Sequence, residues 1–348
     1  MIHSRRAVLA AGLGLAACKP TVASPPQPTS PPLKSVAPFP VGAAVQAGQL
    51  DDPALAALLA DNVSQLTAEW EMKMEYMLLA DGSFRFDRPD RIADFARAHG
   101  QRLLGHTLVW YAQSPPAFER LSGRRSGFER AYAAYIQAVV GRYRGLASGW
   151  DVVNEAVAED GDGWRDSLWA RELGPFDHMV QAFHLAHEAD PDAVLFLNDY
   201  NLETLPKKRA TFLGLAERLL AAGAPLGGLG TQTHVNADLP AGALKSTLSD
   251  LASLGLPVHL SEFDVSVVRA RRLGVSDAAL VEGQARVYAE AAEAFAALPA
   301  GQRFAFTFWG LRDGESWLRR ENAADTPSPF TAAGRPKPSA AAWIGALG

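Results

Sequence analysis

The stretch Gly149-Trp150-Asp151-Val152-Val153-Asn154-Glu155-Ala156 decides the fold and marks a candidate site. Its apolar run, residues 150–153, predicts a short buried strand. The strand ends at an amide and a carboxylate side by side. A carboxylate at the end of a buried strand is poorly solvated, so its surroundings can tune its proton affinity. Glu155 is therefore a candidate catalytic group.

A second stretch of the same kind is Val258-His259-Leu260-Ser261-Glu262-Phe263-Asp264, about a hundred residues further along. Again an apolar strand ends at a glutamate. Two carboxylates that flank a bond are the minimum that hydrolysis of a glycosidic linkage needs. Glu155 and Glu262 therefore favour a retaining glycoside hydrolase, if the fold brings the two strand ends together.

Apolar runs and helical periodicities alternate along the chain from residue 39 onward. The expected strands cover 39–45, 63–67, 103–110, 150–153, 193–197, 228–235, 258–263 and 304–309. The first expected helix begins at residue 54, and the others cover 88–99, 128–143, 177–189, 207–222, 241–254, 278–298 and 339–347. Such strict alternation implies parallel strands.

Two architectures have parallel strands in this alternation. An open doubly wound sheet usually has fewer strands and a glycine-rich phosphate loop, and no strand–helix junction of this sequence carries one. A closed ring of eight strands fits the length and the alternation better. We therefore predict the fold class α/β, as a single (β/α)8 TIM barrel with its active site at the carboxyl ends of the strands.

Length and composition limit the classes of protein to consider. The 348 residues are 48% hydrophobic, which suffices for one large core or two small ones. The net charge of −5 argues against a nucleic-acid partner. The single cysteine, Cys18, excludes an intrachain disulfide and a cysteine metal cluster. No stretch after residue 20 is long and apolar enough to cross a membrane.

The first residues predict an export signal rather than part of the fold. Residues 1–18 have a basic start with Arg5-Arg6, followed by an apolar run rich in Ala, Gly and Leu. The paired arginines resemble a twin-arginine signal, although Val8 stands where that signal usually has Phe. Leu15-Ala16-Ala17-Cys18 resembles a bacterial lipobox, in which Cys18 would be lipidated and anchor the chain to a membrane. The alternative is a simple signal that is cleaved nearby, with Cys18 incidental.

The chain is expected to divide into three segments. The signal peptide at 1–18 is followed by residues 19–38, which are rich in Pro, Ser and Thr and predict a semi-extended linker. Residues 39–348 then form the catalytic barrel domain. We expect an exported protein, either a periplasmic or cell-surface lipoprotein or otherwise a secreted one.

Polar side chains gather at the carboxyl ends of the expected strands. They are Glu69, His106, Asn154 with Glu155, Asn198 with Asp199, Gln232 with His234, and Glu262, while Trp309 closes the eighth strand. A phosphate site would need more cations than Lys73 alone, and a metal site would need His and carboxylates at ligand spacing. Amides, carboxylates and tryptophans suit the hydroxyls and apolar faces of sugars. We therefore expect a sugar ligand, with no metal and no organic cofactor.

Six motifs follow one another in a characteristic order. They are Gly105-His106-Thr107-Leu108-Val109-Trp110, Trp150-Asp151-Val152-Val153-Asn154-Glu155, Asn198-Asp199-Tyr200-Asn201, Gly230-Thr231-Gln232-Thr233-His234, Ser261-Glu262-Phe263-Asp264 and Phe306-Thr307-Phe308-Trp309-Gly310. Each is moderately specific alone, and the six in this order are very specific. From about Phe39 to the C-terminus, the chain resembles glycoside hydrolase family 10, the endo-1,4-beta-xylanases.

The resemblance implies a role for each site residue. Glu262 would be the nucleophile and Glu155 the general acid/base of a double displacement, which needs the two carboxyl groups about 5–5.5 Å apart. His234 would hold the nucleophile, and Asn154 would bond the sugar 2-hydroxyl. The other substrate-binding residues would be Glu69, Lys73, His106, Trp110, Gln113 and Gln232 on the glycone side, with Trp309 and Trp317 as an aromatic floor or wall. The implied substrate is beta-1,4-xylan or xylo-oligosaccharides, and we expect a monomer.

The chain also departs from the family pattern. The segment Glu69-Trp70-Glu71-Met72-Lys73-Met74 stands where the family usually has Glu-Asn-x-Met-Lys-Trp, so Trp70 replaces an Asn that would contact sugar. Tyr111 replaces a usual His. Residues 118–128, with three arginines, are hard to align; a solvated loop is the simpler interpretation, although arginines there could meet acidic xylan side groups. These departures affect substrate preference more than the reaction.

Two alternatives stay open beside a xylanase. The first is a related retaining barrel glycosidase that acts on another beta-linked glycan or on short aryl glycosides, which the changes at Trp70 and Tyr111 permit. The second is a catalytically inactive barrel that binds sugar or acts as an inhibitor. The presence of Glu155, Glu262 and His234 argues against the second.

Overall fold

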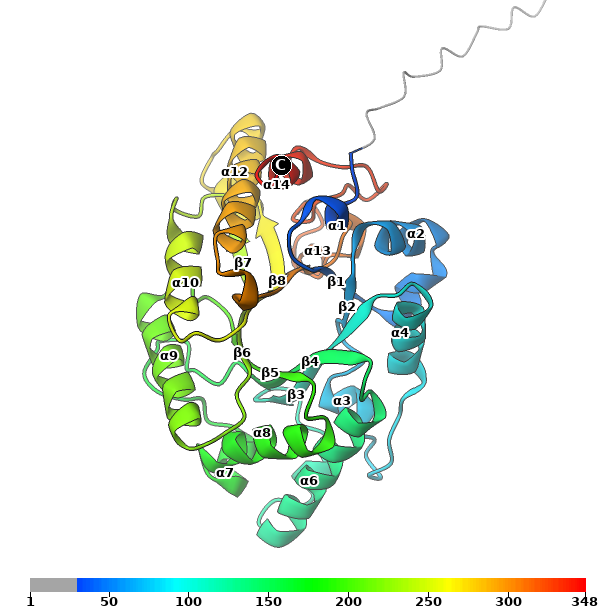
Figure 1. The fold of residues 1–348 in the computed structure, drawn as a ribbon, viewed down its shortest axis with the longest axis vertical. Coiled ribbons are helices and arrows are strands. Elements are labelled where there is room, and N and C mark those ends of the chain that lie inside the picture. The colour runs from blue at the N-terminus through cyan, green and yellow to red at the C-terminus, as the bar shows by residue number, and fades with distance from the viewer. Residues whose placement is uncertain (1–29) are drawn as a thin grey trace, which may run out of the picture. The chain divides into compact units, whose positions relative to one another are not determined.

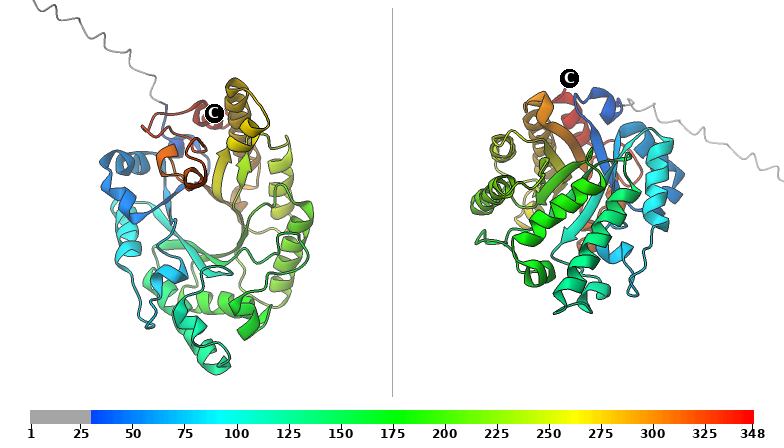
Figure 2. Two further views of the ribbon diagram at one scale, coloured as in Figure 1. Left: turned by 180° about the vertical axis from the view of Figure 1, so that it is seen from behind. Right: turned by 60° about the horizontal axis from the view of Figure 1, so that its bottom comes forward.

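The computed structural model describes residues 30–348 and shows a closed barrel of parallel strands inside a layer of helices (Figures 1 and 2). The strands are β1 (Val41–Val45), β2 (Gln65–Ala68), β3 (Arg102–Trp110), β4 (Ala147–Asn154), β5 (Val194–Asp199), β6 (Gly228–Thr231), β7 (His234–Asn236), β8 (Val258–Ser266) and β9 (Arg303–Phe308). The ring runs β6-β5-β4-β3-β2-β1-β9-β8 and closes where β6 pairs with β8. The predicted (β/α)8 TIM barrel is therefore confirmed.

Each strand of the ring is followed by an outer helix. These helices are α2 (Pro53–Asn62), α4 (Asp87–Ala98), α6 (Arg125–Arg142), α8 (Asp177–Ala189), α9 (Pro206–Ala221), α10 (Ala243–Ala252), α12 (Asp277–Ala296) and α14 (Pro338–Gly345). Shorter helices are α1 (Leu33–Val36), α3 (Met74–Met77), α5 (Pro116–Glu119), α7 (Leu168–Leu173), α11 (Val268–Arg272) and α13 (Leu318–Glu321). Most of these short helices lie in the loops that follow the strands, and those loops surround the candidate site.

The structure corrects the expected sixth strand. The sequence predicts one strand over 228–235, but the structure has two, β6 and β7, separated by Gln232 and Thr233. Thr233 has a φ of 60°, a left-handed conformation that a continuous strand does not contain. β7 consequently leaves the ring and pairs with β8 alone, with His234 opposite Asp264. Gln232 and His234 therefore do not share one strand.

In the structure, the folded domain begins earlier in the chain than residue 39, where the sequence predicts its start. Helix α1 lies inside the segment 19–38 that the sequence predicts as a linker. Leu33 is fully buried, and its N–H donates to Asn62 Oδ1 at 3.2 Å. The compact unit runs from Pro31 to Gly348. Leu33 and Lys34, whose Nζ donates to the carbonyl of Ala60 at 2.6 Å, tie this proline-rich segment to helix α2. The predicted signal at 1–18, Cys18 and the linker up to residue 29 lie outside the described residues.

Close packing inside the ring requires glycine at several strand positions, and Gly105 is the tightest of them. A Cβ on Gly105 would lie 2.0 Å from Trp150 Cε3, so a larger residue on β3 would collide with the fully buried indole on β4. Helix α14 closes the outer layer through Trp343, whose ring packs edge to face against Phe306 and Phe308 of β9 at 5.5 and 5.7 Å. The C-terminal helix therefore stabilises the last strand of the ring.

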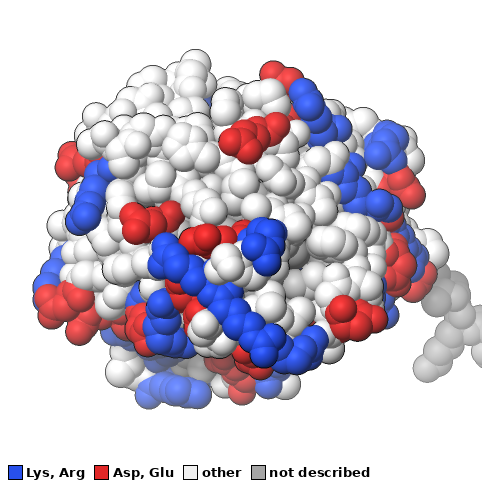
Figure 3. All heavy atoms as spheres, turned by 90° about the horizontal axis from the view of Figure 1, so that it is seen from below, with Lys and Arg blue, Asp and Glu red and all other residues white. Residues whose placement is uncertain are grey.

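The surface carries both signs of charge. On the face seen in Figure 3, basic and acidic side chains lie interspersed. Exposed ion pairs such as Arg171 with Asp166, at 2.6 Å, contribute little stability individually. Within residues 30–348, no helix combines the length and the apolar character that a membrane span requires.

Candidate active site

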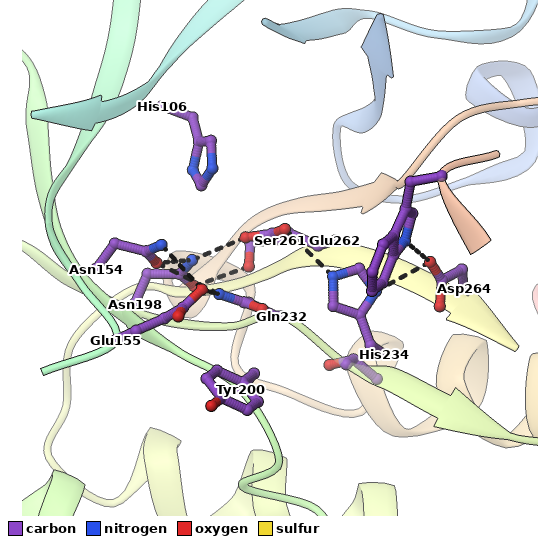
Figure 4. A network of polar contacts seen from close by, with 12 residues as sticks. His106, Asn154, Glu155, Asn198, Tyr200, Gln232, His234, Ser261, Glu262 and Asp264 are labelled. Atoms are coloured by element: carbon purple, nitrogen blue, oxygen red, sulfur yellow. Dashed lines mark hydrogen bonds and ion pairs between the residues drawn. The ribbon is translucent and has the colours of Figure 1, made fainter. Parts of the chain in front are cut away.

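Glu155 and Glu262 belong to one hydrogen-bonded network at the carboxyl ends of the strands (Figure 4). Glu155 directly follows β4 with a φ of 57°, and Glu262 lies in β8; both are buried, with 9% and 4% of their surface exposed. Asn154 Nδ2 donates to Glu155 Oε1 at 3.3 Å. Asn198 Nδ2 donates both to Asn154 Oδ1, at 2.9 Å, and to Glu262 Oε1, at 3.1 Å. Two amides thus connect the carboxylates, as the fold prediction requires.

Neutral amides surround Glu155. Gln232 Nε2 donates to Glu155 Oε1 at 2.9 Å and also approaches Asn154 Oδ1 at 3.4 Å. The amide of Asn198 has a fixed orientation, because Ser261 Oγ donates to its Oδ1 at 2.8 Å. Asn198 stands at an expected strand end in the sequence but is not among the predicted site residues. Its place beside the barrel mouth, in line with Asn154 on the neighbouring strand, is the signal that could have found it.

His234 connects Glu262 with a second acid, Asp264. Its Nε2 lies 3.3 Å from Glu262 Oε2, and its Nδ1 lies 2.9 Å from Asp264 Oδ2. Trp317 Nε1 also donates to Asp264 Oδ2 at 2.9 Å. Burial lowers the pKa of His234, but Asp264 and Glu262 outweigh it and raise the pKa to about 10. His234 is therefore a cation at neutral pH, and Asp264 is a site residue that was not predicted from the sequence.

The charge of Glu262 is stabilised by its neighbours. Burial acts to raise its pKa, but His106, His234 and Lys73 outweigh burial and lower it. His106 is itself held by Asp151, whose Oδ2 lies 2.9 Å from its Nδ1. Glu262 is consequently a carboxylate at neutral pH, which suits a nucleophile.

Lys73 lies between aromatic rings near the carboxylates. Its Nζ lies 4.7 Å from the ring centroid of Trp110 and 5.6 Å from that of Trp70. Burial lowers its pKa, against the opposing charges of Glu262, Glu155 and Glu69. The ammonium therefore faces the site without a single dedicated partner among residues 30–348, which leaves it available to a ligand.

The remaining predicted residues lie around this centre. Trp309 packs edge to face on His106 and His234, at 5.3 and 6.1 Å, and so forms part of the wall together with Trp317. Gln113, with a φ of 56°, lines a small cavity together with Lys73 and Trp110. The structure places all of the predicted site residues from Glu69 to Trp317 at this end of the barrel.

An arginine that stacks on a tyrosine lines a small cavity with Glu155. Arg165 Nη2 donates to the hydroxyl of Tyr200 at 2.6 Å, and its guanidinium lies 4.4 Å from the ring centroid of Tyr111. Tyr111, Glu155 and Arg165 line one small cavity. Tyr111, the residue that departs from the family pattern, is therefore part of an aromatic and cationic group beside Glu155.

Asp199 has a structural role at the barrel mouth. It accepts from the backbone N–H of Val157 at 3.0 Å and of Tyr200 at 2.9 Å. Its Oδ1 lies 3.0 Å from Nζ of Lys208, which is fully buried. Burial raises the pKa of Asp199 to about 6, although Lys208 acts to lower it. These contacts indicate that Asp199 orders the loops at the barrel mouth.

Two further features of the sequence lie outside the network. Arg120 and Arg124 line a separate cavity of about 630 Å³ with Phe84 and Tyr135, and none of its lining residues belongs to the site. Within residues 30–348, no group of three His, Cys, Asp or Glu side chains is arranged to hold a metal ion.

Comparisons with known proteins agree on one family. The model of glycosyl hydrolase family 10 matches residues 33–346. The endo-1,4-beta-xylanase B of Paenibacillus barcinonensis is 38% identical over 290 residues, which are 80% of this chain and 86% of the relative. A crystal structure of xylanase XynB from the same organism, complexed with a conduramine derivative, superimposes with a TM-score of 0.84 at 34% identity and covers 91% of this chain and 99% of that chain.

Other relatives are much longer than this chain. Exoglucanase XynX of Acetivibrio thermocellus is 35% identical over 300 residues, which are 82% of this chain. The chain spans about a quarter of the length of XynX and of endo-1,4-beta-xylanase A of Thermoanaerobacterium saccharolyticum, 27% and 25% respectively.

Proposed function

The chain belongs to glycosyl hydrolase family 10, and from this premise we propose that it is a retaining endo-1,4-beta-xylanase. The proposed substrate is beta-1,4-xylan or a xylo-oligosaccharide. The observation that carries the proposal is the network from Glu155 through Asn154 and Asn198 to Glu262. It links two carboxylates with different neighbours through two amides at one end of the barrel.

The reaction proceeds by double displacement. Glu262 attacks the anomeric carbon, while Glu155 donates its proton to the leaving glycosidic oxygen. The bond to the aglycone breaks as the bond to Glu262 forms, which leaves a covalent glycosyl-enzyme and an ionised Glu155. Glu155 then takes a proton from water, the water oxygen attacks the anomeric carbon, and Glu262 leaves as a carboxylate.

The surrounding residues support each stage. His234 keeps Glu262 charged and oriented before the attack. Asn154 donates to Glu155 and is linked to Glu262 through Asn198. Its amide can donate to the sugar 2-hydroxyl, a bond that strengthens in the transition state. Lys73, Glu69 and the rings of Trp309 and Trp317 supply polar and apolar contacts for the neighbouring sugars.

Glu262→Ala tests the mechanism. We expect the release of reducing ends from beta-1,4-xylan to be abolished, because no group remains to attack the anomeric carbon. Undiminished hydrolysis would contradict the assignment. In the parent protein, NMR of the first-formed product should show the beta anomer, and an alpha product would show that the reaction inverts.

A second candidate function is hydrolysis of another beta-linked glycan or of short aryl glycosides. Trp70 and the Tyr111–Arg165 stack favour it, because both change the walls of the site. A relative with the name exoglucanase points the same way. A substrate panel of xylan, beta-glucan, mannan and aryl glycosides distinguishes the two by their kcat/KM values.

We also propose that the chain is exported through residues 1–18, is lipidated at Cys18 and acts as a monomer. The basic and apolar pattern of the first residues supports export, and the lipobox resemblance supports lipidation. Mass spectrometry of the mature N-terminus tests both. An unmodified Cys18, or a chain that begins after it, would contradict the lipid anchor. Sedimentation of the purified protein tests the monomer.

A further inference from the structure

An exposed arginine pairs with Glu69 at the rim of the barrel face. Arg320 lies in the four-residue helix α13, and 67% of its side chain is exposed. Its Nη2 lies 3.3 Å from Glu69 Oε1. This is the one side-chain hydrogen bond or ion pair that Arg320 makes within the described part of the chain.

Glu69 itself is an acceptor that faces the site. Its side chain is 12% exposed where β2 ends, and its Oε1 also accepts from Gln46 Nε2 at 3.0 Å. Its second oxygen has no hydrogen-bond partner among residues 30–348. The Lys73 ammonium interacts electrostatically with Glu69 and also with Glu262 and Glu155, so Glu69 shares this cation with the two site carboxylates. The second oxygen of Glu69 can therefore accept from a sugar hydroxyl at this end of the barrel.

The pair joins two separate loops. Glu69 follows β2, while Arg320 belongs to the loop after β9, and β1 lies between these strands in the ring. The guanidinium therefore spans part of the barrel mouth to reach Glu69. Because it occupies Oε1, a sugar hydroxyl that binds there has to share or displace it.

Trp70 increases the importance of this carboxylate. The family usually has Asn at this position, whereas an indole offers one donor and no acceptor. Trp70 is partly buried and packs beside the Lys73 ammonium. Of the two carboxylates in this loop, Glu71 is buried and accepts from the backbone N–H of Ala47, so Glu69 is the one that a sugar can use.

We propose that Arg320 is a specificity-determining residue that acts as a latch over Glu69 and weakens the binding of glycone sugars that use this carboxylate. The inference rests on the proposed function, because the family resemblance assigns Glu69 to the glycone side. An exposed ion pair between long side chains is weak, so the latch opens readily and changes affinity by about two- to fivefold. Short substrates that do not reach Glu69 are not affected.

Arg320→Ala tests the latch in steady-state kinetics. We expect KM for long xylo-oligosaccharides to fall about two- to fivefold with unchanged kcat. An aryl xyloside, with one sugar before the scissile bond, should give the same KM in both proteins. Higher ionic strength should lower the KM of the parent protein toward that of the variant, because salt screens an exposed pair.

Arg319→Ala is the matched control. Arg319 is adjacent in the same helix, but its Nη1 donates to the carbonyl of Asp325 at 3.2 Å and it makes no contact with Glu69. A higher KM in Arg320→Ala would show that Arg320 contributes a sugar contact, and would overturn the latch. An equal effect of Arg319→Ala, or an equal effect on the aryl xyloside, would overturn it as well.

Calorimetry separates the latch from the proposed function. Glu262→Ala, which removes turnover, is compared with the Glu262→Ala, Arg320→Ala double variant on xylo-oligosaccharides. Tighter binding by the double variant supports the latch. Binding without that gain overturns the latch alone, whereas no binding by either protein overturns the proposed function and the latch with it.

Discussion

The two site carboxylates have different neighbours, although one network holds both. Glu262 is bonded to the cationic His234 and to Asn198, and the surrounding positive charge keeps its pKa low in spite of burial. Glu155 accepts from two neutral amides, those of Asn154 and Gln232. One group can therefore stay charged as a nucleophile while the other exchanges a proton.

Removal of His234 should affect the acid side of the pH–rate profile. In His234→Ala, burial is no longer offset by the imidazolium, so the pKa of Glu262 rises and the acid limb of kcat/KM moves to higher pH. We expect kcat to fall as well, because Glu262 loses an orienting bond. The measurement is kcat/KM between about pH 4 and 9. His187→Ala, at an exposed position of α8, should leave the profile unchanged. An acid limb at the same pH in His234→Ala would contradict the role assigned to His234.

Lys208 is predicted to be a stabilising residue. It is fully buried and pairs with the buried Asp199 at 3.0 Å. Lys208→Met leaves that carboxylate without its cation, which should lower the free energy of unfolding by about 3–5 kcal/mol at pH 8. Lys207→Ala is the control, because the Lys207–Asp162 pair at 2.5 Å is more than half exposed at both ends. Chemical denaturation measures both variants, and equal losses would contradict the prediction.

The loss in Lys208→Met should also depend on pH. Burial raises the pKa of Asp199 to about 6 in the folded protein, above its unfolded value. The folded state therefore binds this proton more tightly, so stability falls as pH rises through 6. Without Lys208 the pKa of Asp199 rises further, and at pH 5 the carboxyl is neutral and needs no cation. The variant should consequently lose less stability at pH 5 than at pH 8, and a larger loss at pH 5 would contradict this account.

A glycine-to-alanine substitution should change the free energy of unfolding in opposite directions at two positions, one in a strand and one in a helix. Gly105→Ala in β3 would bring a Cβ within 2.0 Å of the Trp150 ring, and we expect a loss of at least about 2 kcal/mol. Gly214 lies at an exposed position of α9, where a Cβ would meet no other atom within 4 Å. Gly214→Ala should therefore raise the free energy of unfolding by about 0.5–1 kcal/mol. Thermal unfolding of both variants checks the pair, and a shift of Tm in the same direction would contradict it.

For the molecule as a whole, the folded unit is predicted to need α1. Leu33→Ala removes a fully buried side chain that fixes this helix on α2, and should cost about 2–4 kcal/mol. Leu220→Ala, at a site that is 38% exposed, should cost less than about 1 kcal/mol. Denaturant unfolding compares them. If Leu33→Ala were neutral, the segment before Phe39 would behave as the linker that its composition predicts.

Most of the fold could be predicted because its periodicities are local. The boundaries of α8 agree to the residue. The other outer helices begin within three residues of the prediction and, wherever an end was predicted, end within two residues of it. The break at Thr233 could not be predicted, because an ordinary threonine adopts a left-handed φ only when the surrounding structure holds it there. Leu33 was missed because the Pro-rich composition around it outweighs one apolar residue.

The site was predictable where a strand end and a motif coincide, as for Glu155 and Glu262. Asp264 was not recognised, because its function depends on His234 from a different strand and on the indole of Trp317. Such a contact between segments distant in sequence has no local signature. The Arg320–Glu69 pair, 251 residues apart in sequence, was unpredictable for the same reason.

Because β7 lies outside the ring, the protein should lose activity on warming before the barrel unfolds. The barrel stays hydrogen-bonded all the way around without β7, since β6 pairs directly with β8. β7 is held by three paired residues of β8 and carries His234. Detachment of this short strand would take the His234 imidazolium away from Glu262, while the circular dichroism of the barrel would stay unchanged. Thermal inactivation should therefore precede global melting, and the amide protons of residues 234–236 should exchange with deuterium sooner than those of β6.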